Sequence, residues 1–128
     1  MREITKTVSV PVDGKPRDFR LTKLDAFSGV FLLRLMTRLP EKGASVEALL
    51  SGLSDGEIRS LMTTCLQHCE VLLPAGWMPV MTRGEWSFPE LEHDTAVCLR
   101  LTIEEVLWTL SGFFAGGGLT SRSETPAS

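Results

Sequence analysis

The sequence predicts a mainly α domain with a minor β component: a small bundle of four to five helices preceded by an N-terminal β-hairpin. Three observations support this fold class. Several segments of helical length follow capping residues, one N-terminal segment alternates as a strand does, and 128 residues with 43% hydrophobic side chains suit one compact domain. We therefore expect a single domain over residues 1–115, with the hairpin in residues 1–22, and a flexible tail over residues 116–128.

The hairpin prediction starts from the segment Ile4 to Val12, where apolar and polar residues alternate. Such alternation is typical of a half-buried strand. Asp13-Gly14 follows, and this dipeptide between two extended segments is a strong signal for a tight turn. The return strand is expected from Arg17 to Leu21.

A first helix is predicted over residues 26–39, after a segment over residues 22–25 that resembles an N-cap. Apolar residues lie on most sides of this helix, which is typical of a helix in the centre of a core or at a subunit interface. We therefore predict that the protein self-associates through three large apolar side chains of this helix, Phe27, Phe31 and Leu35.

Two helices are predicted in the middle of the chain. One is short, over residues 45–50, and the other runs from a capping box at Ser54 and Glu57 to about Leu72. Residues 73–90 contain three prolines and two glycines, so we expect an irregular loop there, with at most a short strand at Met78–Thr82.

The C-terminal part predicts two more helices. Asp94 is expected to cap a short helix that ends near Arg100, and Thr102 with Glu105 resembles a second capping box that begins the last helix. In this interpretation Glu104 and Glu105 lie in a first turn, where acidic residues interact favourably with the helix dipole. The expected core face of the last helix carries Ile103, Val106, Leu107, Leu110 and Phe114.

Composition and charge exclude several classes of function. The formal net charge is −3 and lysine and arginine do not cluster, which argues against binding to nucleic acid. No apolar run reaches the roughly 18–20 residues of a membrane span, and the first residues lack the apolar segment of a secretory signal. We therefore expect a cytoplasmic protein with no membrane partner, and the odd number of cysteines, three, favours reduced thiols.

Cys65, His68 and Cys69 form the only group that invites a metal hypothesis. A structural zinc site needs four ligands, and the fourth would have to be His93 or Cys98, far along the chain. We favour the alternative that the cysteines are small core residues that continue an apolar stripe, and we predict no metal and no cofactor.

Catalysis is not expected either. A nucleophilic pair of Cys98 with His93 has little support, because the sequence carries no hydrolase, metalloprotease or phosphate-loop motif. A helix-turn-helix drawn from residues 45–50 and 54–72 would place Asp55 and Glu57 at the start of the recognition helix, where phosphates would repel them.

The aromatic residues are the better candidates for partner binding. Trp108 and Phe113 fall outside the expected core face of the last helix. They either anchor an interface, together with Phe114, or pack inside a bundle that surrounds the helix on two sides. Trp77 and Trp86, in the irregular segment, are the next candidates.

Several of these features together resemble the tail assembly chaperones of long-tailed bacteriophages and prophages. The resembling segments are the Val-rich strand that enters the Asp-Gly turn, the run Phe19 to Leu24, the leucine-rich helix, and the runs Leu99 to Thr102 and Leu110 to Phe114. The resemblance implies a small, acidic, mostly helical and self-associating protein. It also implies that the protein binds the tape measure protein, keeps it soluble, helps the tail tube protein to assemble around it, and is absent from the finished virion.

Two other functions remain open. A structural virion component, such as a tail-completion or connector subunit, would persist in purified particles, whereas a chaperone would not. A small DNA-binding regulator is a third hypothesis, against which the negative net charge argues.

Overall fold

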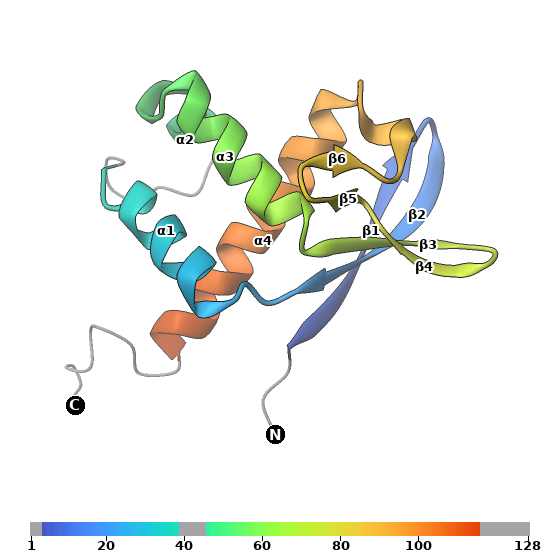
Figure 1. Cartoon of the computed structure of the whole chain (residues 1–128), viewed down its shortest axis with the longest axis horizontal. Coiled ribbons are helices and arrows are strands. Elements are labelled where there is room, and N and C mark those ends of the chain that lie inside the picture. The colour runs from blue at the N-terminus through green and yellow to red at the C-terminus, as the bar shows by residue number, and fades with distance from the viewer. Residues whose placement is uncertain (1–3, 39–45, 116–128) are drawn as a thin grey trace.

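A computed structural model of the chain describes residues 4–38 and 46–115, and these form an α+β fold (Figure 1). The elements in chain order are β1 (Thr5–Val12), β2 (Lys15–Thr22), α1 (Ala26–Met36), α2 (Val46–Gly52), α3 (Asp55–Leu66), β3 (Cys69–Leu73), β4 (Gly76–Pro79), β5 (Met81–Thr82), β6 (Glu85–Trp86), the 3-10 helix η1 (Pro89–Leu91) and α4 (Thr95–Ala115). Figure 1 shows α1, α2 and α3 grouped on one side of the molecule and the strands on the other. The predicted tail over residues 116–128 lies outside the described residues.

The prediction of a mainly α fold is wrong. The described residues form a four-stranded antiparallel sheet in the order β1-β2-β3-β4 and a two-stranded sheet of β5 and β6. The N-terminal hairpin is confirmed: Val12 pairs with Lys15 across a turn in which Asp13 and Gly14 both have positive φ, 53° and 77°. Positive φ at both central residues defines the type I′ turn that the right-handed twist of a hairpin prefers.

The β3–β4 hairpin was not predicted from the sequence. The helix predicted to reach Leu72 ends at Leu66, and Cys69 begins β3, which pairs with β2 so that Phe19 faces Val71. The spacing of apolar residues in this segment is compatible with either a helix or a strand. Pairing with β2, about fifty residues away in the sequence, determines that the segment forms a strand. The irregular loop expected after it contains β4, β5 and β6 instead of a single short strand.

Two helix starts follow from their capping residues. The Ser54 side chain accepts a hydrogen bond from the Glu57 amide at 3.2 Å, and the Glu57 carboxylate accepts one from the Ser54 amide at 2.9 Å, which confirms the capping box of α3. At α1 the cap is Asp25, whose carboxylate accepts from the Ser28 amide at 3.2 Å.

The prediction of two C-terminal helices is wrong, because α4 is continuous. It is one helix of 21 residues, and the capping box expected at Thr102 and Glu105 does not form. The Thr102 hydroxyl donates to the Cys98 carbonyl at 2.8 Å, one turn earlier, and both Thr102 and Glu105 are buried. A Ser/Thr-x-x-Glu pattern marks a helix start only where the preceding residues leave the helix, and here Asp94 already caps that helix with a 3.1 Å bond from the Val97 amide.

The interior consists of two clusters of buried side chains. The sheet core contains Val10, Val12, Phe19, Leu21, Leu66, Cys69, Val71, Val80, Met81, Phe88, Leu91, Val97, Cys98 and Leu101. The helical core contains Leu32, Leu35, Leu49, Leu53, Leu61, Cys65 and Val106. α4 contributes to both, with its first half in the sheet core and Val106 in the helical core, so it joins the two parts of the fold. None of the helices in the described ranges is both long enough and apolar enough to span a membrane.

Candidate functional site

Two exposed apolar side chains lie next to each other on α1. Phe27 is 88% exposed and Val30, three residues further on, is 56% exposed. Residues three apart on a helix are neighbours on one face, so these two side chains form one patch, which we call the α1 patch. Arg34, one turn further along the helix, is exposed and borders it. Covering a phenylalanine ring with a partner stabilises a complex by about 2–3 kcal/mol, so this patch is a candidate binding surface.

The three residues predicted to mediate self-association have different environments. Phe27 belongs to the α1 patch, Phe31 is half-buried against the helical core, and Leu35 is 4% exposed and belongs to that core. Leu35 is therefore a core residue of this chain. The exposure of Val30 could not be predicted from the sequence, because a helix that is apolar on most sides does not reveal which side faces solvent.

The three tryptophans predicted to bind a partner, Trp77, Trp86 and Trp108, lie in different environments. Trp108 is half-buried against the sheet core, with the Lys23 ammonium 5.7 Å from its ring. Leu107, which was expected in the core, is 48% exposed, because the continuous α4 turns Trp108 toward the sheet instead. The side chains of Phe113 and Phe114 lie outside the described part of the structure.

Trp77 lies on the open face of the four-stranded sheet. The Arg20 guanidinium stacks 4.4 Å from its ring and donates two hydrogen bonds, of 2.8 and 2.6 Å, to the Glu70 carboxylate. Arginine stacked on an aromatic ring and paired with a carboxylate holds three strands in register. Trp77 therefore has an intramolecular role in the sheet.

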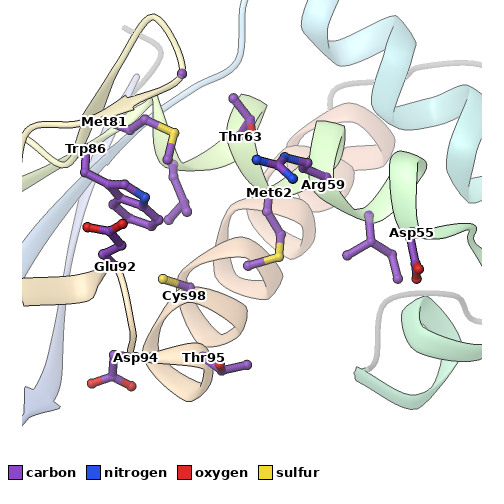
Figure 2. A pocket seen from close by; sticks show the side chains of 13 residues that line it. Asp55, Arg59, Met62, Thr63, Met81, Trp86, Glu92, Asp94, Thr95 and Cys98 are labelled. Carbon is purple, nitrogen blue, oxygen red and sulfur yellow. The ribbon is translucent and has the colours of Figure 1, made fainter. Parts of the chain in front are cut away.

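Trp86 lines a cavity of about 400 Å³ between α3, the β5–β6 hairpin and the start of α4. Figure 2 shows Trp86 and Met81 on one side of it and Met62 and Arg59 of α3 on the other. Cys98 is the only cysteine among its lining residues, and its thiol donates to the Leu91 carbonyl at 3.3 Å. Burial raises the pKa of Cys98 to about 11, so this sulfur is protonated at neutral pH and a poor nucleophile.

The three residues considered as possible metal ligands, Cys65, His68 and Cys69, lie in different structural elements. Cys65 is in α3 and Cys69 is in β3, and both nitrogens of His68 face other partners: Nδ1 lies 2.8 Å from the Thr64 carbonyl and Nε2 lies 3.4 Å from Asp25. Within residues 4–38 and 46–115, no group of three or more His, Cys, Asp or Glu side chains is arranged to hold a metal ion.

Comparisons of the chain with protein-family models, with curated proteins and with solved structures found no match.

Glu105 is the residue whose environment sequence reasoning missed most completely. It is fully buried in α4, and neither carboxylate oxygen has a hydrogen-bond partner among the residues that the structure describes. The Thr109 hydroxyl, one turn further on, has none among them either. Burial raises the pKa of Glu105 to about 8, and a charge on Glu105 would raise the pKa of the Cys65 and Cys69 thiols. A carboxylic acid in this position is neutral at neutral pH. No pattern in the sequence indicates that Glu105 is buried while its neighbour Glu104 is half-exposed.

Burial also determines how the thiols react. We expect Cys65, Cys69 and Cys98 to remain unmodified by a thiol reagent such as DTNB in the native protein and to react when the protein unfolds, because all three are buried and desolvation raises their pKa. A Ser60→Cys variant, with a thiol on the exposed side of α3, provides the positive control and should react within the mixing time. Rapid labelling of more than that one thiol in native protein would contradict the buried placement.

Proposed function

We propose that this protein is a tail assembly chaperone of a long-tailed bacteriophage that acts by binding, with the α1 patch as the surface for its client. The client is the tape measure protein encoded in the same genome, which is held soluble in the host cytoplasm until the tail tube protein assembles around it. The observation that carries the proposal is the exposure of Phe27 and Val30 side by side on one helix. The resemblance of the sequence to tail assembly chaperones supports the choice of client.

The mode of binding follows from the shape of the α1 patch. Phe27, Val30 and the half-buried Phe31 follow the i, i+3, i+4 spacing by which one helix packs against another. A long helical client that exposes an apolar stripe would cover Phe27 and remove its own stripe from water at the same time. Such binding keeps the client soluble and requires no catalytic group in the chaperone.

The test is co-expression of the tape measure protein with variants of this chain. We expect a Phe27→Ser/Val30→Ser variant to lose most of the client from the soluble fraction, because removing a central aromatic anchor weakens binding by about 2 kcal/mol, or roughly 30-fold. Leu72→Ser is the matched control: Leu72 is 41% exposed on the open face of the sheet, so this variant also loses an exposed apolar side chain but leaves α1 intact.

Both variants should melt like the wild type, since substitutions at exposed positions change stability by about 0.5 kcal/mol or less. A double variant that is folded and keeps the client soluble would rule out the α1 patch. A wild-type protein that never retains the client would rule out the function itself. Mass spectrometry of purified particles should find the tape measure protein and not this chain. The presence of this chain in the particles would favour a structural virion component.

A further inference from the structure

β1 is an edge strand with open hydrogen-bonding groups. In the sheet order β1-β2-β3-β4, its described partner is β2 alone. The Thr22 amide donates to the His68 carbonyl at 2.8 Å, away from β1, so Thr22 and its partner Thr5 form a pair without mutual hydrogen bonds. Pairs alternate along an antiparallel ladder, so Thr5, Thr7, Ser9 and Pro11 all direct their backbone groups outward.

The outward face of α4 lies directly beside this edge. Lys6 of β1 and Glu104 of α4 approach to 4.0 Å, which places the Glu104 side of the helix next to β1. A mainly apolar hollow on this side is lined by Ala96, Leu99, Arg100, Ile103 and Glu104. Leu107, which is 48% exposed, lies one turn further along the same helix. The open edge of β1 and the exposed face of α4 are therefore adjacent.

We propose that two copies of this chain pair through their β1 edges about a two-fold axis, which joins the two sheets into one and packs α4 against α4 across the axis. In the register centred on Thr7, each Thr5 faces Ser9 of the second copy and the two Thr7 residues face each other. All residues that donate in this register have an amide hydrogen, and together they form about six backbone hydrogen bonds. A register centred one residue further along would place Pro11, which has no amide hydrogen, opposite Thr5.

Charge complementarity on α4 favours a second copy as the occupant. Arg100 and Glu104 are one turn apart on the outward face, with a 3.5 Å contact between them. Two antiparallel α4 helices that cross near residue 102 bring Arg100 of each copy to Glu104 of the other. Each copy then offers one basic and one acidic group to the identical pair on its partner, which is the arrangement that an isologous interface requires.

The features that usually block an edge strand do not block this one. Lysines and prolines on edge strands hinder the addition of further strands. Here Lys6 faces the inner side of the sheet, opposite the buried Leu21, and is neutralised by Glu104. Pro11 lies next to the turn, which leaves the segment from Thr5 to Ser9 available.

The experiment measures the mass of the purified protein in solution, without any client, by sedimentation equilibrium at about 1–100 μM. We expect the wild type and a Thr7→Ala variant at twice the 14.1 kDa chain mass, and Thr7→Pro at the chain mass. Proline at position 7 removes one outward amide hydrogen, which β2 does not use, so the hairpin itself should persist. The alanine control keeps that amide and changes only the side chain.

A second variant tests the helix layer independently of the strand. Arg100→Glu would place two like charges at each crossing contact and should weaken the dimer at least tenfold, whereas Arg59→Glu, the same charge change on α3, should not. If Thr7→Pro proves unfolded by circular dichroism, Arg100→Glu decides. A monomeric wild type at 100 μM, or a dimer that survives Arg100→Glu and a folded Thr7→Pro, would overturn the proposal. Client binding through the α1 patch uses a different surface, so it can succeed or fail separately.

Discussion

Replacing Glu105 with methionine is expected to stabilise the protein by about 3 kcal/mol at pH 8 and to remove most of the fall in stability between pH 5 and pH 8. The pKa of Glu105 is raised from 4.5 to about 8 in the folded protein by burial. Between these two values the folded chain keeps a proton that the unfolded chain has released. The contribution of Glu105 to stability is therefore complete at low pH and is lost as the pH rises.

The measurement is urea denaturation of the wild type and three variants at pH 5, 6, 7 and 8. The free energy of unfolding of the wild type should fall with pH, and the curves of Glu105→Gln and Glu105→Met should be nearly flat. The groups that interact with Glu105 are the thiols of Cys65 and Cys69, whose raised pKa keeps them neutral over this range. Glu47→Gln, the same charge change at an exposed residue of α2, should keep the wild-type slope. Equal slopes for wild type and Glu105→Gln would contradict the buried position of Glu105.

Phe19→Ala is expected to cost about 3–5 kcal/mol of stability, comparable to the whole stability of many small domains. Phe19 is fully buried at the centre of the four-stranded sheet, where it pairs with Val8 on one side and Val71 on the other. Chemical denaturation should show this loss. Asp18→Ala is the matched control, because Asp18 is exposed and its side chain points to the other face of the same strand. A small effect at Phe19 would argue against a sheet core.

Local signals in the sequence predicted the parts of the fold that depend on neighbouring residues. The Asp13-Gly14 turn needs positive φ at two successive positions, and the Ser54 capping box satisfies its own helix start. The same local signals failed at Cys69 and Thr102. Cys69 joins a strand because β2 offers an open edge, and Thr102 lies inside a helix that Asp94 already started. In both cases a partner outside the local window decides the structure.

The candidate site could be predicted only in part for a related reason. Phe27 and Leu35 belong to the same apolar helix, and the sequence treats them alike. The structure separates them, because α1 packs its Leu32 and Leu35 side against the helical core and leaves Phe27 exposed. Trp108 shows the converse: it lies off the expected stripe, yet it packs against the sheet core because α4 is continuous. Which side of an apolar helix binds a partner is a property of the assembled fold.

The most direct test of the proposed function is an NMR titration of the ¹⁵N-labelled protein with helical segments of the tape measure protein. We expect saturable binding, with the largest shift changes at the amides of α1 around Phe27 and Val30 and small changes at β4 around Trp77. Saturable binding with its largest changes on β4 or at the cavity beside Trp86, or no binding by any segment at millimolar concentration, would contradict it.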